Sequence, residues 1–294
     1  MKRALIIGLF AAGILGSCNE VPPRIDFSEP ILLARDTSYI TYDVPGNPPR
    51  NILLEDVSGV NCQRCPRAAE IAHELKDRYP ERVIVMTEHP EPGGGFGPLV
   101  APFNDSQDSF NTKEATDIVA NLIQNVGSLP NGAINRKDLL GNGSLALPKY
   151  ETWKSHVENE LSEKAEVDLK VELIPKDNRT VVANIKTTFL NALDHQVLLS
   201  VFLTESHIIS KQFMPDRSMN YDYEHNFILR KGITHSQGLP LSPSVEKGRV
   251  IEKGFEIEIP ERFKPENCSI VVLVHELDGE NREVLQCQEK KVKP

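Results

Sequence analysis

Cys62 and Cys65 are the residues of this sequence best suited to chemistry, because only Gln63 and Arg64 separate the two thiols. A thiol pair at this spacing can stay closed as a disulfide, exchange with other thiols, or supply two of the four ligands of a zinc site. Zinc is the least favoured, since no second CxxC and no Cys/His pair at ligand spacing completes the set. A quiet disulfide and a working exchange site stand as alternatives, and we favour the disulfide.

The segments on either side of this pair predict a strand, a turn and a helix, in that order. Residues 51–58 form an apolar run suited to a buried strand, residues 59–61 turn the chain, and residues 67–80 place apolar side chains at helical spacing. Pro66 fits the first turn of that helix, where its missing N–H costs nothing. A second buried strand is predicted over 82–87. A CxxC between a strand and a helix of a βαβ unit is typical of thioredoxin-like folds.

The start of a helix is a place where a cysteine becomes reactive. The helix dipole and the free N–H groups stabilise a thiolate there and lower the pKa of the thiol. We therefore expect Cys62 to be the exposed attacking thiol and Cys65 the buried resolving thiol, with Arg64 adding positive charge nearby. Asn61 argues against activity, because thioredoxins usually carry tryptophan at that place.

Pro130 is the third candidate of the same site. A second helix is predicted over 112–125, with Asn111 as its N-cap and Gly127 as its C-cap, and a strand follows near 132–136. In thioredoxin-like folds a cis-proline begins the strand after this helix and lies beside the CxxC. Pro130 resembles that proline in order and context.

Two further segments complete a first domain, which we place at 51–164. The stretch 89–110 is long and rich in glycine and proline, so it is either a binding loop or an insertion that covers an edge of the sheet. Residues 150–164 predict a last helix.

The remainder, 165–294, predicts a second domain made of strands. Short alternating runs follow one another with turn signals between them, which is typical of an all-β sandwich. Residues 214–225 and 234–244 are expected to be exposed loops. The predicted strands are 166–173, 180–189, 196–205, 207–213, 225–233, 253–259, 269–277 and 283–290.

Cys268 and Cys287 belong to this second domain. Asp278-Gly279 between the last two strands is a hairpin signal. A hairpin centred there places Cys287 opposite a residue near Val272 rather than opposite Cys268. A Cys268–Cys287 bridge is therefore possible but not favoured.

The N-terminus has the pattern of an export signal. Lys2 and Arg3 precede an uncharged apolar run over 4–15, which is too short to span a bilayer. The next residues, 15–18, read LGSC and resemble the bacterial lipobox, whose cysteine is acylated. We expect a signal peptide over 1–17, a lipid anchor on Cys18, and a proline-rich tether over 18–50 with a possible strand at 31–33.

Charge and motifs narrow the function further. The formal net charge is −9, and the chain has no basic run, so we expect no nucleic-acid partner. The sequence holds no GxSxG, HExxH or P-loop motif, and we expect neither a cofactor nor a metal.

Taken together, the lipobox, the proline-rich lead, the segments LLEDVSGVNCQRCPRAAEI and SLPNGAINR, and the β-rich tail resemble one family. This is the Omp28-related (outer-membrane-protein-28-like) family of surface lipoproteins of Bacteroides-like bacteria, and the LLEDVSG–CxxCP block is the most specific part of the resemblance. The resemblance implies an α+β two-domain protein, in which a thioredoxin-like α/β domain precedes an immunoglobulin-like sandwich, and residence in the outer membrane.

Two functions follow as expectations. The first is a non-enzymatic outer-membrane lipoprotein, an accessory or binding module that is attached to the membrane through Cys18 and has a possible outer-membrane protein partner. The second is a periplasmic or surface thiol–disulfide oxidoreductase that uses Cys62 and Cys65. The fold alone does not decide between them.

Overall fold

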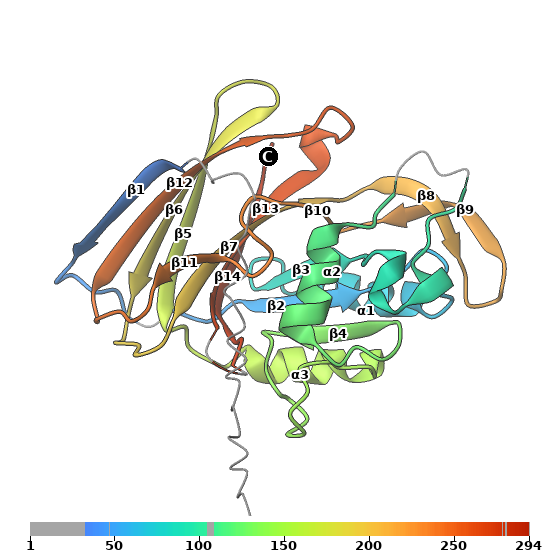
Figure 1. Cartoon of the computed structure of the whole chain (residues 1–294), viewed down its shortest axis with the longest axis horizontal. Helices are drawn as coiled ribbons and strands as arrows, with labels where there is room; N and C mark the ends of the chain where they lie inside the picture. The colour runs from blue at the N-terminus through green and yellow to red at the C-terminus, as the bar shows by residue number, and fades with distance from the viewer. Residues whose placement is uncertain (1–32, 47, 105–108, 278, 280, 294) are drawn as a thin grey trace, which may run out of the picture. The chain divides into compact units, whose positions relative to one another are not determined.

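The computed structural model describes residues 33–294 except 47, 105–108, 278, 280 and 294. The predicted signal peptide and Cys18 lie outside the described residues. Within the described residues the chain is mostly β, with strands in a four-stranded, an eight-stranded and a two-stranded sheet (Figure 1).

The helices are α1 (Cys65–Arg78), α2 (Lys113–Ile118) and α3 (Trp153–Glu160). The strands up to the middle of the chain are β1 (Leu33–Ile40), β2 (Ile52–Val57), β3 (Val83–Glu88), β4 (Asn131–Ile134), β5 (Val167–Pro175), β6 (Thr180–Phe189) and β7 (Val197–Glu205). The later strands are β8 (Ile208–Phe213), β9 (Met219–His225), β10 (Ile228–Gly232), β11 (Leu239–Ser242), β12 (Arg249–Glu258), β13 (Cys268–Glu276) and β14 (Val284–Lys291).

The region that carries the cysteine pair is a βαβ unit with one added strand. β2 and β3 pair in parallel with α1 between them in the sequence, and β4 pairs antiparallel with β2. Ile52 and Leu54 pack against α1 and α3, whereas Leu53 and Val57 face the core that includes α2. Both faces of β2 are covered, which is why its sequence is a continuous apolar run.

Most strands after residue 165, together with β1, pack as two layers. The four-stranded sheet has the order β1-β12-β6-β5, and its inner side chains meet those of β7 and β13 in one apolar core. Alternation along β5 and β6 puts one apolar residue in two toward that core. The predicted period-two pattern thus produces the expected packing of sheet on sheet.

One sheet contains strands from both predicted domains. The eight-stranded sheet has the order β14-β13-β7-β10-β3-β2-β4, with β11 on β7. The junction is a parallel contact at which the N–H of Thr87 donates to the carbonyl of Phe227 at 2.8 Å. At the other side, the N–H of Val284 donates to the carbonyl of Asn135 at 2.9 Å. Strands from before and after residue 165 therefore form one continuous layer.

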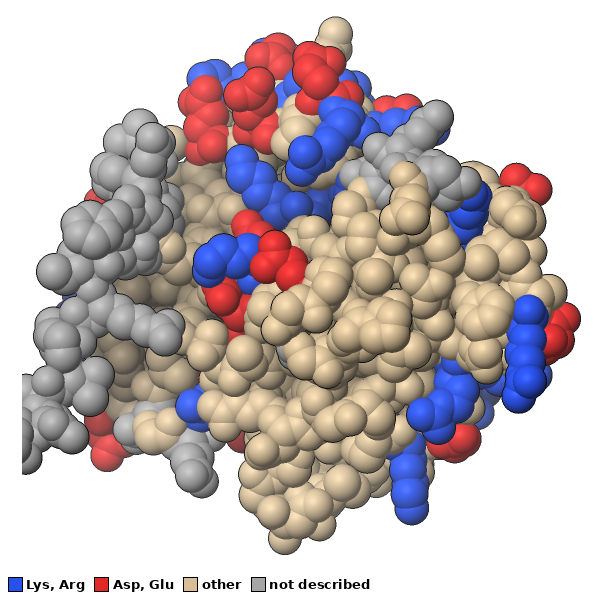
Figure 2. Space-filling view, turned by 45° about the vertical axis from the view of Figure 1, so that its right-hand side comes forward, with Lys and Arg blue, Asp and Glu red and all other residues tan. Residues whose placement is uncertain are grey.

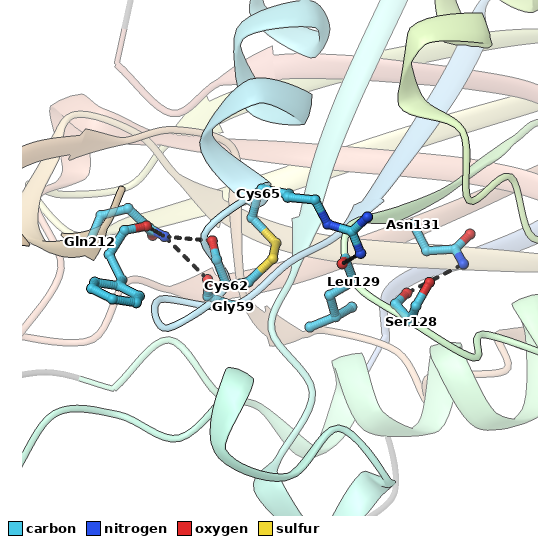
Figure 3. Close-up of a disulfide and its surroundings, with 9 residues drawn as sticks. Gly59, Cys62, Cys65, Ser128, Leu129, Asn131 and Gln212 are labelled. Carbon is cyan, nitrogen blue, oxygen red and sulfur yellow. Dashed lines mark hydrogen bonds between the residues drawn. A yellow bond between two sulfur atoms is a disulfide. The ribbon is translucent and has the colours of Figure 1, made fainter. Parts of the chain in front are cut away.

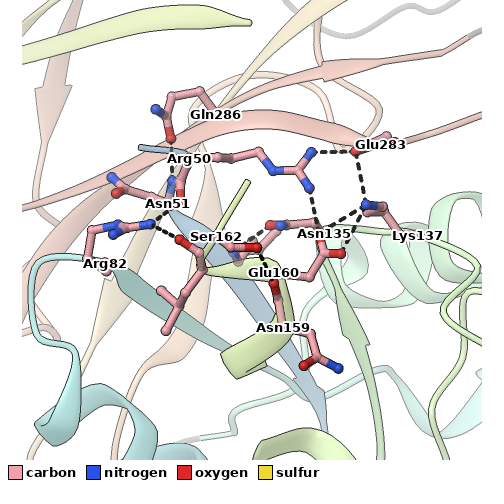
Figure 4. Close-up of polar contacts among 12 residues, drawn as sticks. Arg50, Asn51, Arg82, Asn135, Lys137, Asn159, Glu160, Ser162, Glu283 and Gln286 are labelled. Carbon is pink, nitrogen blue, oxygen red and sulfur yellow. Dashed lines mark hydrogen bonds and ion pairs between the residues drawn. The ribbon is translucent and has the colours of Figure 1, made fainter. Parts of the chain in front are cut away.

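A buried ionic network reinforces this connection (Figure 4). Arg50 contacts Glu160 of α3 at 2.5 Å and also Glu283, which directly precedes β14. Lys137 lies 3.0 Å from Glu160. The Arg50 side chain is 7% exposed, so its charge depends on these partners. Four segments far apart in the sequence are joined by these contacts.

Several elements differ from the sequence prediction. Residues 33–40, assigned to the tether, form the edge strand β1, which pairs with β12; six of the eight residues are exposed, so the strand lacks the apolar pattern that would have revealed it. β9 and β11 lie where loops were predicted. β9 is polar because its partner is β8 alone, in a hairpin with little core of its own. The N-cap of α2 is Thr112 and not Asn111, since the Thr112 hydroxyl accepts from the N–H of Ala115 at 3.1 Å.

The end of the second helix also differs. After α2 the chain continues as one π-helical turn over Val119–Ile123. It stops where Gln124 and Asn125 adopt positive φ angles of 58° and 52°, before Gly127 is reached. The backbone at Gln124 and Asn125 thus ends this helix, instead of the predicted cap at Gly127.

The two late cysteines do not form a disulfide. Cys287 lies opposite Leu273, one residue from the predicted position, and both Cys268 and Cys287 are free and buried. Burial raises the pKa of the Cys268 thiol to about 12, which makes it unreactive at neutral pH. Cys268 and Cys287 each belong to an apolar core cluster.

Candidate functional site: the buried disulfide and its cover

Cys62 and Cys65 form a disulfide, with an S–S distance of 2.07 Å and a Cα–Cα distance of 5.4 Å. Cys62 lies in the turn after β2, and Cys65 is the first residue of α1 with Pro66 directly behind it. The N–H of Cys65 donates to the carbonyl of Cys62 at 3.2 Å. The strand, turn and helix therefore position the pair as the sequence predicted.

The predicted exposure of Cys62 is wrong. Cys62 is 2% exposed and Cys65 is 1% exposed. A thiol or disulfide with so little exposed surface is closed to a macromolecular thiol in this conformation. Two segments that are distant in the sequence account for this burial.

The first cover is part of the glycine-rich stretch 89–110. The N–H of Asn61 donates to the carbonyl of Leu99 at 3.1 Å, and the Asn61 amide donates to the carbonyl of Ala101 at 2.8 Å. Gly59 makes this approach possible, because a Cβ at that position would overlap the Leu99 carbonyl. Asn61, which replaces the usual tryptophan, thus holds the cover over the site.

The second cover is the hairpin formed by β8 and β9 (Figure 3). The Gln212 amide donates to the carbonyl of Cys62 at 3.3 Å and to that of Gly59 at 3.4 Å. The N–H of Phe213 donates to the carbonyl of Val60 at 2.9 Å. Sequence reasoning missed this cover because it comes from a hairpin 150 residues further along the chain.

Pro130 directly follows Leu129, which lies near the cysteine pair. The Leu129–Pro130 peptide bond is cis, which is the geometry expected of this proline. The Arg64 guanidinium, inside the CxxC, donates to the carbonyl of Leu129 at 3.2 Å (Figure 3). Leu129 also shares an apolar cluster with Cys62 and Cys65. The role of Pro130 at the disulfide stays a prediction.

Asp56 is an ionisable residue that the sequence reasoning did not select. Strand alternation puts it on the same face of β2 as Ile52 and Leu54, which is the face that α1 covers. It is fully buried, and neither carboxylate oxygen has a hydrogen-bond partner among the described residues. Burial raises the pKa of Asp56 to about 7. The signal in the sequence that could have identified Asp56 is an acidic residue inside the apolar run 51–58, which predicts a buried strand.

Glu88, on the neighbouring strand β3, is a second buried acidic residue, and it lies near the ion pair of Glu55 and Arg136. Arg136 and Glu55 form a fully buried ion pair with contacts of 2.5 and 3.0 Å. Burial, together with the negative charge of Glu55, raises the pKa of Glu88 well above its usual range. Glu88 therefore holds a proton more readily than an exposed glutamate does.

A pocket of about 300 Å³ opens between α1 and the hairpin. Cys65 lines it, together with His89, Tyr223 and His225, whereas Cys62 does not. Burial lowers the pKa of His89 to about 3 and that of His225 to about 4, so both rings are neutral at neutral pH. The volume of the pocket is at the lower end of the range for small-molecule sites.

Over residues 33–293, with the gaps given above, no group of three or more His, Cys, Asp or Glu side chains is placed to hold a metal ion. None of the described helices is long and apolar enough to cross a bilayer.

Solved structures resemble this fold at low sequence identity. HBP35 of Porphyromonas gingivalis aligns with a TM-score of 0.63 and 15% identity over 84% of this chain and 76% of that one. A protein from Agrobacterium tumefaciens aligns with a TM-score of 0.50 and 9% identity over 83% and 95% of the two chains. A domain of the outer membrane lipoprotein Omp28 from Porphyromonas gingivalis aligns with a TM-score of 0.31 and 19% identity over 44% and 90%. These identities bear on the fold alone.

Comparison of the sequence with characterised proteins and with family models gives two further results. No curated protein matches the chain. The family model described as outer membrane protein Omp28 matches residues 120–294. The match does not include the LLEDVSG–CxxCP block. It covers more than half of the chain, and the protein accordingly belongs to the Omp28 outer membrane protein family.

Proposed function

We propose that this protein is a lipid-anchored outer-membrane module that acts by binding, and that its Cys62–Cys65 disulfide is a structural cross-link. The observation that carries the proposal is the burial of both cysteines under two separate covers, which Asn61 and Gln212 hold in place. An exchange protein needs one sulfur within reach of its partner. Family membership supports association with the outer membrane.

The fold assignment within this proposal is specific. The order β2, α1, β3, β4, with a cis-proline before β4 and beside a CxxC, supports a thioredoxin-like domain over 51–164. The two-layer packing of the later strands supports an immunoglobulin-like sandwich over 165–294. The sheet that the two share supports a rigid connection between them.

The molecular surface supports a binding role. Three stretches of the chain carry no Lys, Arg, Asp or Glu, namely 92–104, 118–135 and 139–148. The face seen in Figure 2 has a broad area without charged side chains in its central and lower part, bordered by charges along the upper edge, at the right and in a cluster left of the centre. Leu99 and Leu140, from two of these stretches, are 38% and 48% exposed. Uncharged surfaces of this kind are typical of protein contacts, which supports an outer-membrane protein as the partner.

The attachment to the membrane rests on Cys18 and its lipobox. Replacing Cys18 with alanine should give a precursor that is neither processed nor anchored, because the acylated side chain is missing. Fractionation of cells and mass spectrometry of the N-terminus measure this directly. A Cys18→Ala protein that is still processed and remains in the membrane fraction would contradict the anchor.

One observation favours a second candidate, a thiol–disulfide oxidoreductase. Asp56 is a buried carboxyl on the α1 side of β2, its pKa is raised to about 7, and it is able to accept a proton from a cysteine thiol at neutral pH. Insulin reduction by dithiothreitol separates the two candidates. The detergent-solubilised protein should not accelerate it beyond the Cys62→Ser/Cys65→Ser variant, whereas clear acceleration by the unsubstituted protein alone would favour the oxidoreductase.

A further inference from the structure

The pocket between α1 and the β8–β9 hairpin has a one-sided charge pattern. Four carboxylates line it, Glu70, Glu74 and Asp77 from α1 and Glu224 from β9, and no lysine or arginine does. Asp77 lies 3.7 Å from His73, and Glu224 lies 2.7 Å from His207. Glu70 and Glu74 have no ion-pair partner among the described residues and are exposed at the mouth of the pocket. The pocket therefore attracts a cation.

A hydrogen-bond acceptor lies deeper in the same pocket. His225 is 5% exposed, and its Nε2 atom has no partner within the described residues. The backbone of Ser210 and Lys211 hydrogen-bonds to the ring. The neutral ring carries one hydrogen, and we assign it to Nδ1, because Nε2 has no partner in the described structure. The lone pair of Nε2 is then free to accept a hydrogen bond from a ligand.

Aromatic side chains complete the lining. Tyr223 and Phe227 belong to the lining, and Tyr223 is in edge contact with His225, with 4.8 Å between the ring centroids. Burial raises the pKa of Tyr223 to about 12, so its phenol stays neutral. The faces of aromatic rings attract ammonium groups when water is partly excluded.

We propose that this pocket binds a small ligand through a primary ammonium group, with the carboxylates of Glu70 and Glu74 at its mouth and Nε2 of His225 as the acceptor within. An ammonium has three N–H donors and a full positive charge, which is the complement of carboxylates, an unpartnered lone pair and aromatic faces. The volume of about 300 Å³ suits a short amine or a single lysyl side chain. The inference rests on the proposed binding role, to which it assigns a site and a ligand class.

The test is calorimetric titration of the detergent-solubilised full-length protein with two probes, cadaverine and Nα-acetyl-lysine amide. Binding of either probe supports the site. Tighter binding of cadaverine indicates a free amine as the ligand, and tighter binding of Nα-acetyl-lysine amide indicates a lysyl side chain. Glutarate, which has a similar length and the opposite charge, should not bind. The variant Glu70→Gln/Glu74→Gln should bind at least fivefold more weakly, because two of the four charges are removed.

Controls separate this site from a general effect of charge. The variant Glu172→Gln/Glu258→Gln removes two exposed carboxylates that do not line the pocket, and it should bind both probes as the unsubstituted protein does. His225→Asn should weaken binding while Cys62 and Cys65 stay oxidised, and the ring signals of His225 in NMR spectra should shift on titration. The site is overturned if neither probe binds at millimolar concentration, if glutarate binds equally well, or if the Glu70→Gln/Glu74→Gln variant keeps full affinity. None of these results alters the insulin-reduction test, so the two proposals fail separately.

Discussion

The disulfide and Asp56 belong to one small region, yet they affect the molecule in opposite ways. The disulfide restrains the unfolded chain and stabilises the fold. Asp56 has no hydrogen-bond partner for either oxygen in the described structure, so an ionised carboxylate there is costly. Its raised pKa expresses that cost.

The variant Asp56→Asn should lose the pH dependence that this residue imposes. The pKa of Asp56 rises from 3.8 to about 7 on folding. The contribution of Asp56 to the free energy of unfolding is therefore fully present below pH 3.8. It is lost as the pH rises to about 7, and the total loss is about 4 kcal/mol. Asparagine cannot ionise, so the variant should be the more stable protein at pH 8.

Urea unfolding at pH 5 and pH 8 measures this difference. The exposed variant Asp43→Asn serves as the control and should follow the unsubstituted protein at both pH values. If the unsubstituted protein and the Asp56→Asn variant lost the same stability between pH 5 and pH 8, burial would not be holding the Asp56 carboxyl neutral.

Removal of the disulfide should have a modest effect on stability. The bond closes a very short loop, so the variant Cys62→Ser/Cys65→Ser should lose about 2 kcal/mol of unfolding free energy. The same loss is expected on reduction of the unsubstituted protein. Binding of cadaverine should persist in this variant, since neither sulfur supplies a charge to the pocket.

The two covers are the elements that decide whether the disulfide can react. Segment 99–101 lies against Asn61, and the β8–β9 hairpin contacts the cysteine turn through Gln212 and Phe213. Positive φ angles at His207 and Phe227, of 57° and 60°, mark both ends of the hairpin. The access of thiols therefore depends on elements outside the βαβ unit.

Gly59→Ala should open the first cover. An added Cβ overlaps the Leu99 carbonyl, so the cover must shift, at a cost of about 1–3 kcal/mol in stability. Dithiothreitol should then reduce the disulfide several times faster. Gly127→Ala is the matched control, because a Cβ there meets no atom within 4 Å, and it should change neither property. Unchanged reduction kinetics in Gly59→Ala would mean that segment 99–101 does not limit access.

Local sequence signals predicted the elements around the disulfide but not its cover. The apolar run before Cys62, Pro66 at the helix start and the order of Pro130 are local features, and each led to the observed position. The exposure of Cys62 was predicted wrongly because burial there depends on a hairpin that begins at Ile208. Contacts between distant segments leave no periodic pattern in a single sequence.

At the level of the whole molecule, the shared sheet and the Arg50 network should make unfolding cooperative. β10 pairs with β3, and Arg50 links Glu160 to Glu283. Trp153, the single tryptophan, is fully buried in the region before residue 165. Tryptophan fluorescence reports on that region, whereas far-ultraviolet circular dichroism reports chiefly on the later strands.

Arg50→Met should lower the free energy of unfolding by about 3 kcal/mol, because two carboxylates lose a buried partner. The fluorescence and dichroism transitions should coincide in urea and shift together. Arg78→Met breaks an exposed pair with Glu158 and should cost less than about 1 kcal/mol. A fluorescence transition that shifts alone would indicate that the two regions unfold independently.

The central claim, a structural rather than catalytic disulfide, is tested most directly by the reduction potential of the Cys62–Cys65 pair. Equilibration of the detergent-solubilised protein in dithiothreitol redox buffers, followed by alkylation and mass spectrometry, gives this value. We predict a potential below about −300 mV, as is typical of structural disulfides, whereas a value between about −270 and −120 mV, the range of exchange proteins, would contradict the account.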